Sequence, residues 1–98
     1  MENVIKYEGL IINQGNKLVS VDGEDISLTK KEYELLVFLI THPNYVHSRE
    51  DLIKELWDNT VTVRAIDTTI SRLRKKLGEY GSCITTRLGF GYSFHVEE

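Results

Sequence analysis

The residues with the clearest potential for chemistry are the cations and hydroxyls between positions 63 and 77. If this segment is a helix with 100° per residue, and Ile66 and Leu77 set its core face, its polar side chains gather on the opposite side. That side presents Arg64, Thr68, Ser71 and Lys75, flanked by Arg72, with Arg74 on a shoulder. Short hydrogen-bonding side chains let a helix approach base edges, while long cations grip phosphates on both banks of a groove. This combination favours nucleic-acid binding.

Asp67 is the one carboxylate near this face. It could accept a hydrogen bond from a cytosine amino group, or hold a neighbouring arginine in place. The competing interpretation of the segment is a solvated helix end, because Lys and Arg favour the negative pole of a helix dipole. Donors in the closing segment favour nucleic acid, because such groups reach phosphates beside a groove-bound helix. They are Thr85, Thr86, Arg87 and Tyr92.

Catalysis and metal binding find little support in the sequence. There is no phosphate-binding loop, no Ser/His/Asp spacing and no cysteine beside a histidine, so we expect no enzyme, no catalytic residue and no cofactor. His42, His47 and His95 are too scattered to predict a metal site. A lone Cys83 cannot form an internal disulfide, which agrees with a reducing compartment.

The charge is unevenly distributed along the chain. The net charge of −3 argues against a phosphate binder if it is taken as an average. Residues 1–58, however, carry six Lys/Arg against eleven Asp/Glu, whereas residues 59–92 carry six against two. One face can therefore meet a polyanion while the acidic remainder limits non-specific binding.

The elements that must position these residues can be predicted from the apolar pattern. Strands are expected at 5–12, 17–21 and 25–28, separated by hairpin signals at 14–16 and at Asp22-Gly23. A capping box at Thr29 and Glu32 predicts a core helix that ends at His42-Pro43. Ser48 should cap a second helix. The buried stripe of this second helix is expected to comprise Leu52, Ile53, Leu56 and Trp57.

A third helix over about 63–77 is expected to turn a single face inward and to end at Gly78. The predicted inward residues are Val63, Ile66, Ile70, Leu73 and Leu77. The tail alternates on either side of Leu88-Gly89-Phe90-Gly91, which indicates a closing hairpin. The predicted fold class is α+β: a winged helix-turn-helix with an N-terminal antiparallel sheet, three helices and a C-terminal hairpin wing.

At this point the chain resembles a known family. RAIDTTISRLRKKL, at 64–77, followed by TTRLGFGYSF, at 85–94, is similar to the OmpR/PhoB-type winged helix-turn-helix effector domain of two-component response regulators. The resemblance covers essentially the whole chain. It implies a four-stranded N-terminal sheet, a third helix in the major groove and a wing beside the backbone or the minor groove.

The resemblance also implies roles for individual residues. Positions matching Asp67, Thr68 and Arg72 face base edges. Positions matching Trp57, Arg64, Ser71, Arg74, Thr86 and Tyr92 meet the DNA backbone. From the helical face and the hairpin pattern we add Lys75 and Arg87 as phosphate contacts. For Trp57, core packing is the expected main role and a phosphate contact a secondary one.

Some positions depart from the family pattern. Leu88 stands where a wing arginine is common, and Arg87 one place earlier should point to the other side of the strand. The loop at 58–63, whose family role is to touch RNA polymerase, is about two residues short. Ala65 and Thr69 replace larger or more polar residues, so the operator sequence cannot be copied from a relative.

The resemblance further implies partners. We expect one domain over residues 1–98 without its receiver domain, a sensor kinase acting on the full-length protein, and pairing on direct repeats about 10 bp apart. The isolated chain should be a monomer. With no apolar run of about 20 residues and no signal peptide, we expect a cytoplasmic protein with no membrane role. The alternative is a winged helix that binds protein, for which exposed apolar anchors should replace the cations of the third helix.

Overall fold

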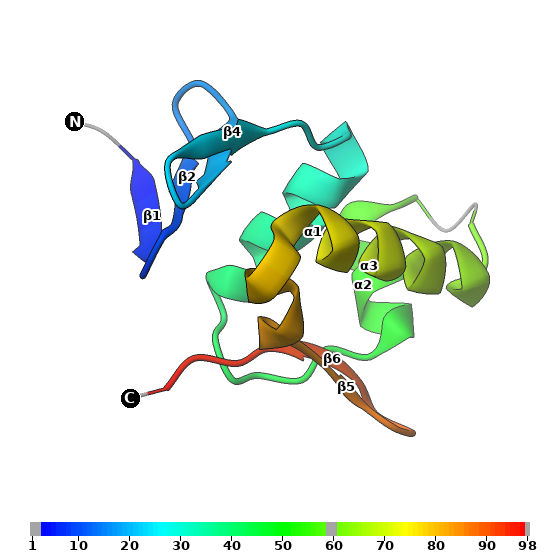
Figure 1. Ribbon diagram of the computed structural model, residues 1–98. Helices are drawn as coiled ribbons and strands as arrows, with labels where there is room; N and C mark the ends of the chain where they lie inside the picture. Colours follow the sequence, from blue (N-terminus) through cyan, green and yellow to red (C-terminus); the bar gives the residue numbers. More distant parts are fainter. Residues whose placement is uncertain (1–2, 59–60, 98) are drawn as a thin grey trace.

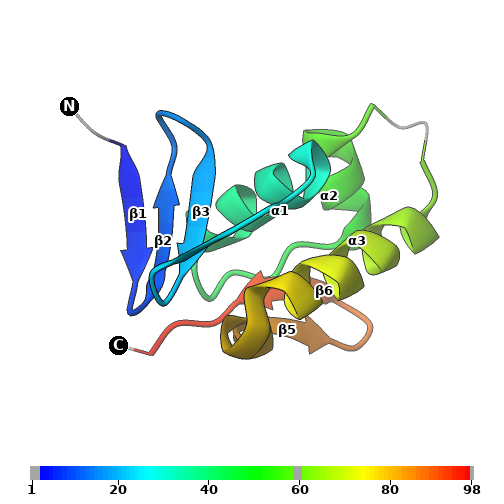
Figure 2. The same ribbon diagram turned by 45° about the horizontal axis from the view of Figure 1, so that its top comes forward.

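The computed structural model describes residues 3–58 and 61–97 of the chain. A four-stranded sheet lies at one end, three helices form the centre, and a two-stranded hairpin projects below the third helix (Figure 1). The sheet and the hairpin lie on different sides of the helical layer, as the turned view makes clear (Figure 2). The predicted α+β winged helix-turn-helix is thereby confirmed.

The sheet is an antiparallel meander of β1 (Val4–Tyr7), β2 (Leu10–Asn13), β3 (Leu18–Val21) and β4 (Glu24–Ile26). The expected single strand over 5–12 is wrong, because the chain reverses at Glu8-Gly9 and Tyr7 pairs with Leu10. Glu8 adopts a positive φ of 53°, which an apolar alternation gives no reason to expect. Four strands, as the family resemblance implied, are therefore present instead of three.

The turn between β3 and β4 follows its sequence signal. Val21 pairs with Glu24 across two residues, Asp22 (φ 51°) and Gly23 (φ 88°). Two positive φ values are the signature of the type I′ turn that Asp-Gly favours. Asp22 also accepts a hydrogen bond from the Tyr80 hydroxyl at 3.2 Å, and that hydroxyl accepts one from the Gly9 amide at 2.8 Å. Two turns of the sheet are thus tied to the segment that follows the third helix.

The first two helices begin at their predicted caps, and the third ends at its predicted glycine. In α1 (Lys30–Ile40) the capping box is complete. The Glu32 amide donates a hydrogen bond to the Thr29 hydroxyl, and the Thr29 amide donates one to the Glu32 carboxylate. In α2 (Arg49–Leu56) the Ser48 hydroxyl accepts from the Asp51 amide at 3.0 Å. The third helix, α3 (Val63–Leu77), has the predicted bounds and ends on Gly78, at a φ of 61°.

The core lies where α3 crosses α1 and α2. The buried residues of α3 are Ile66, Ile70, Leu73 and Leu77, which meet Leu35, Leu36 and Leu39 of α1 and Leu52 of α2 in one cluster. The predicted inward position of Val63 is wrong, because its side chain is 39% exposed. Val63 is the first residue of the helix, a full turn before Ile66, where the helices begin to cover each other. On α2, only Leu52 is fully buried, and Ile53, Leu56 and Trp57 are half-buried.

One ion pair reaches into this core. The Glu32 carboxylate is 2% exposed and meets the Lys76 ammonium at 2.7 Å, which joins the start of α1 to the last turn of α3. Burial opposes ionisation of Glu32, but hydrogen bonds and attraction from Lys76 and Thr29 outweigh it, so the pKa of Glu32 lies below its ordinary value.

The wing is the hairpin of β5 (Ile84–Arg87) and β6 (Gly91–Phe94), which a short 3₁₀ turn, η1 (Gly78–Cys83), connects to α3. Phe94 is fully buried and anchors the wing in the core. The loop between α1 and α2 pairs with β6, since the amides of His47 and Tyr92 each donate to the other's carbonyl, at 2.8 and 2.9 Å. A Cβ on Gly91 would lie 1.9 Å from the His47 carbonyl oxygen, so only glycine permits this approach.

Candidate nucleic-acid interface

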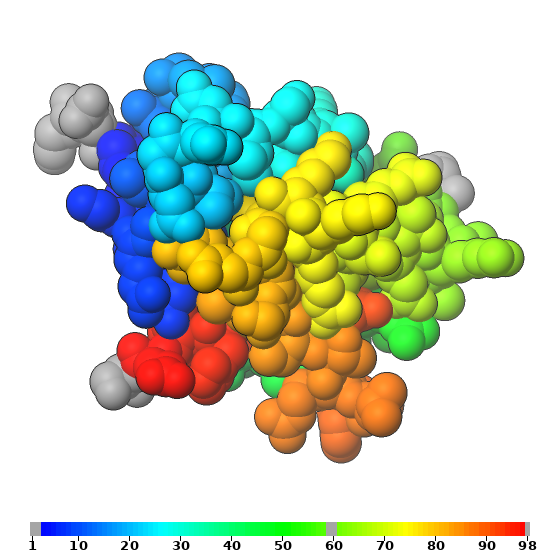
Figure 3. Space-filling model, viewed as in Figure 1, coloured from blue at the N-terminus to red at the C-terminus, as the bar shows by residue number. Residues whose placement is uncertain are grey.

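The outward side of α3 gathers the predicted polar residues. Arg64, Thr68, Ser71, Arg72 and Lys75 are all exposed. Four of them, with Asp67, line one shallow hollow on the helix surface: Arg64, Thr68, Ser71 and Arg72. In the space-filling view α3 runs across one face of the molecule in yellow-green to yellow, with the orange wing projecting below it (Figure 3). The helix and the wing therefore present one continuous surface.

Asp67 lies at the edge of this surface and is engaged by two partners. Its Oδ1 accepts a hydrogen bond from the Tyr92 hydroxyl at 2.5 Å and lies 3.2 Å from the Nε of Arg49, on α2. Of the two roles considered from the sequence, holding a neighbouring arginine is the one these contacts describe. Arg49 and Asp67 are 43% and 41% exposed, so the pair is in contact with solvent.

Tyr92 contributes its hydroxyl from a buried ring. The residue is only 6% exposed. Burial raises the pKa of Tyr92, and the hydrogen bond to the Asp67 carboxylate raises it further, against the opposing effect of Arg49 and Arg74. The phenol therefore stays protonated and keeps donating at neutral pH. Asp67, Tyr92 and Arg49 join α3, the wing and α2 at one point.

Arg74 fastens the wing to α3 at a second point. Its Nε and Nη2 donate to the Ile84 carbonyl at 3.0 and 2.7 Å, and Nη2 also donates to the Thr86 hydroxyl at 2.7 Å. The guanidinium lies over the Tyr92 ring, 5.7 Å from its centroid. The predicted phosphate contact of Arg74 is not tested by these distances, but they give the residue a structural role that its sequence position did not indicate.

The wing carries the remaining predicted residues on two sides. Thr86 is exposed and faces Arg74. Arg87, the next residue, is exposed and lines a hollow with Val46, Ser48, Asp51 and Phe90, beside the start of α2. Thr85 is half-buried, lies on the opposite face of the hairpin from Thr86, and shares a hydrogen bond of 2.8 Å with Ser93. The donors expected from the hairpin are thus divided between α3, α2 and the hairpin itself.

Trp57 contacts Lys31 of α1 and is not part of the exposed face of α3. It forms the C-cap of α2, is half-buried against the core, and has the Lys31 ammonium 5.4 Å from its ring centroid. Lys31 also donates to the Leu56 carbonyl and pairs with Glu34 at 3.2 Å. These contacts agree with core packing as its main role. In the loop at 58–63, predicted to touch RNA polymerase, residues 59–60 lie outside the described residues.

Arg49 is the member of this surface that sequence reasoning missed. It follows the helix cap Ser48 directly, in the sequence SRED, where it could be taken for an ordinary solvated cation. A signal was available, because the helix before a recognition helix crosses the backbone of a bound duplex. Its pairing with Asp67 depends on tertiary packing that local patterns do not encode.

The side chains of the histidines and of the cysteine form no part of the exposed face of α3. Within 3–58 and 61–97, no group of three His, Cys, Asp or Glu side chains is arranged to hold a metal ion. His47 is 5% exposed, and burial together with the nearby His42 lowers its pKa, against a smaller opposing effect of Asp51. Burial likewise raises the pKa of the Cys83 thiol. In the described part of the chain, no helix has the length and hydrophobicity needed to cross a membrane.

Comparisons with known proteins agree with this geometry. The family model for transcriptional regulatory protein, C terminal, matches residues 23–94. The transcriptional regulatory protein ResD of Bacillus subtilis is 42% identical over 101 residues, which cover 97% of this chain and 42% of ResD. The chain thus spans less than half the length of this curated relative.

Two solved structures extend the comparison. The response regulator DrrB of Thermotoga maritima, an OmpR/PhoB homologue, matches with a TM-score of 0.87 at 33% identity, over 95% of this chain and 44% of DrrB. The DNA-binding domain of Klebsiella pneumoniae RstA, solved in complex with the RstA box, matches with a TM-score of 0.81 at 29% identity, over 95% of this chain and 97% of that one.

Proposed function

Because the chain belongs to the family of C-terminal domains of transcriptional regulatory proteins, in its OmpR/PhoB-type winged-helix form, we propose that it binds a specific double-stranded DNA sequence as the output domain of a two-component response regulator. In this proposal α3 enters the major groove and the wing lies along the adjacent backbone. The observation that carries it is the exposed face of α3, where cations and hydroxyls lie together beside an anchored wing.

The residues divide into base-reading and phosphate-binding groups. Thr68 projects from the exposed face and Arg72 flanks it, and both are proposed to reach base edges, Arg72 by a bidentate contact with guanine. Asp67 is proposed to join them while it holds Arg49. The proposed phosphate contacts are Trp57, Arg64, Ser71, Arg74, Lys75, Thr86, Arg87 and Tyr92. To these we add Arg49, whose Nε is occupied by Asp67 while the rest of its guanidinium can serve a phosphate.

The wider setting follows from the family and is proposed with it. The full-length protein would carry a receiver domain, be phosphorylated by a sensor kinase, and place two copies on direct repeats. It would work in the cytoplasm, act by binding and not by catalysis, and contact RNA polymerase through 58–63. The isolated chain would be a monomer.

The test is selection of bound duplexes from a random library, followed by titration of the winning duplex and a scrambled control at several salt concentrations. We expect a repeated half-site and a preference of about 10³ or more over the scrambled duplex. Equal binding to both, or none at low salt, would contradict the proposal and favour the protein-binding alternative.

Two substitutions assign the base-reading role. Arg72→Ala should cost about 1 to 3 kcal/mol on the selected duplex and relax the preference at one base position. Lys6→Ala is the matched control, because it removes an exposed cation from β1, in the sheet away from the wing (Figure 1). If both variants lose the same affinity on specific and scrambled DNA, Arg72 does not read a base.

A further inference from the structure

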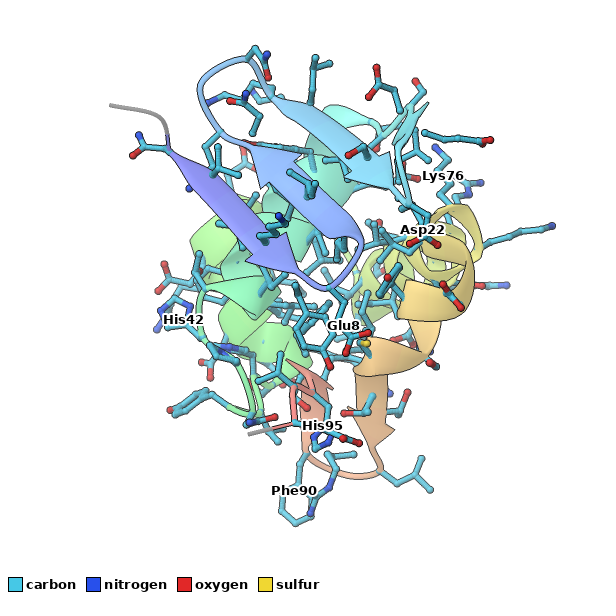
Figure 4. The ribbon with its side chains drawn as sticks, turned by 60° about the vertical axis from the view of Figure 1, so that its left-hand side comes forward. Glu8, Asp22, His42, Lys76, Phe90 and His95 are labelled. Carbon is cyan, nitrogen blue, oxygen red and sulfur yellow. The ribbon has the colours of Figure 1, made fainter. Side chains whose placement is uncertain are left out.

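The tip of the wing exposes two large apolar side chains. Leu88 is 87% exposed and Phe90 is 71% exposed, the two highest values among the large hydrophobic residues that the structure describes. The φ of +83° at Gly89, between them, turns the chain at the tip, and a Cβ there would meet nothing within 4 Å. The Phe90 ring points away from the body of the protein at the end of the hairpin (Figure 4). Apolar groups scattered singly are normal on surfaces, but an adjacent pair at a projecting tip calls for a function.

The geometry of the wing decides where the tip lies when α3 is in a major groove. Arg74 fixes β5 to α3 at Ile84, and Leu88 follows four residues later. At about 3.3 Å per residue, the tip extends about 13 Å beyond this anchor. The major groove is about 12 Å wide, so the centre of a bound helix is about 6 Å from the phosphates on either bank. A hairpin with this reach is long enough to pass the bank and approach the adjacent minor groove.

The charge around the tip favours DNA over a protein as its occupant. Residues 80–94 contain no Asp or Glu, and Arg87 stands next to Leu88. Glu50 and Asp51 of α2 line hollows beside Phe90, where Arg49 and Arg87 offset their charge. The apolar pair is continuous with the cationic face of α3 through Thr86 and Arg74. A hairpin loop of three residues is also slim enough for a minor groove about 6 Å wide. Leucine and phenylalanine cannot hydrogen-bond to bases, but such side chains can press between base steps and partly unstack them.

We propose that Leu88 and Phe90 form an apolar wedge that enters the minor groove beside the α3 site and selects a deformable base step there. This inference rests on the proposed function. The wedge opens the minor groove and bends the duplex toward the major groove, and hence toward α3. It therefore prefers a pyrimidine–purine step such as TA to a stiff A-tract, at a position about half a helical turn from the centre of the α3 contact.

The experiment uses the full 98-residue chain and two duplexes that share the selected core. One duplex carries a TA step at the flanking position, and the other carries an A-tract. Affinity is titrated for wild type, for Leu88→Ser/Phe90→Ser, and for Leu18→Ser. Leu18 is a matched control because it is 51% exposed on β3, in the sheet. Fluorescence of 2-aminopurine at the flanking step reports unstacking, and energy transfer between labelled duplex ends reports bending.

For wild type and for Leu18→Ser, we expect about tenfold tighter binding to the TA duplex, with bending and brighter 2-aminopurine. The double variant should bind both duplexes within twofold of each other, without unstacking, and still prefer the core to a scrambled duplex. Equal flank preference in wild type and in the double variant would overturn the wedge. It would also be overturned if the substitutions changed only self-association, because the apolar pair would then contact a second copy of the chain and not DNA. If wild type binds the selected core no better than a scrambled duplex, the proposed function itself is contradicted.

Discussion

Removing the Arg74 side chain should test how the wing is held. Arg74→Ala deletes a forked interaction with the Ile84 carbonyl, a hydrogen bond to Thr86 and the packing over Tyr92. Hydrogen bonds from a charged group contribute about 1.5 to 3 kcal/mol when buried, and a cation over an exposed ring about 0.5 to 1 kcal/mol. Because Arg74 is half-buried and Thr86 is exposed, we take the two hydrogen bonds to Ile84 as one contribution and give the contacts with Thr86 and Tyr92 less weight. The expected loss is about 2 to 3 kcal/mol.

The assay is urea unfolding followed by circular dichroism, with amide hydrogen exchange of β5 and β6 as a local readout. In thermal unfolding, a loss of this size should lower the Tm of a domain of this length by roughly 8 to 24 °C. Lys75→Ala is the matched control: it removes the neighbouring exposed cation and should stay within about 0.5 kcal/mol of wild type. Arg74→Lys keeps the charge without the fork and should fall between the two. If Arg74→Ala unfolds like Lys75→Ala, and its wing amides exchange no faster, the guanidinium does not hold the wing.

Three further tests probe contacts elsewhere in the fold. Gly91→Ala should cost about 3 kcal/mol or more in urea unfolding, because its Cβ would overlap the His47 carbonyl, whereas Gly89→Ala should cost only about 1 kcal/mol; equal costs would contradict the close approach. Glu32→Gln should lose about 1 to 2 kcal/mol at pH 7, a value reduced by the exposure of Lys76. Since the pKa of Glu32 is lowered from 4.5, its contribution is present above that pH and lost below it, so stability measured from pH 7 to 3 should fall less in the variant. The pKa of His47 is lowered from 6.5 by burial, so wild type should lose stability as the pH falls below about 6.5; if His47→Leu loses as much over that range, another group is responsible.

Local rules predicted much of this fold. Helix bounds followed from Thr29, Ser48 and Gly78, because a cap satisfies backbone groups within four residues of itself. The polar face of α3 likewise depends only on a 3.6-residue period. The reversal at Glu8-Gly9 was not predicted, because the apolar pattern continues through it and glutamate is not a residue type that favours positive φ.

The sequence predicted which side chains form the exposed face of α3, but not the contacts that join this face to α2 and to the wing. Which side chains α3 exposes follows from one helix alone, and Arg64, Thr68, Ser71, Arg72 and Lys75 are all exposed as expected. The links from Asp67 to Arg49, and from Arg74 to Ile84, join residues that meet only when α2, α3 and the wing are packed together. Local patterns carry no information about such pairs, so Arg49 was overlooked.

The links among α2, α3 and the wing also bear on the thermodynamics of binding. Contacts of Asp67 join α3 to α2 and the wing, and those of Arg74 join α3 to the wing again. The three elements are therefore already fixed relative to one another before they meet a duplex. The conformational entropy of ordering them is lost on folding and not on association. Calorimetry of DNA binding should therefore give a heat-capacity change that matches the apolar area buried at the interface, without the additional part that coupled folding produces.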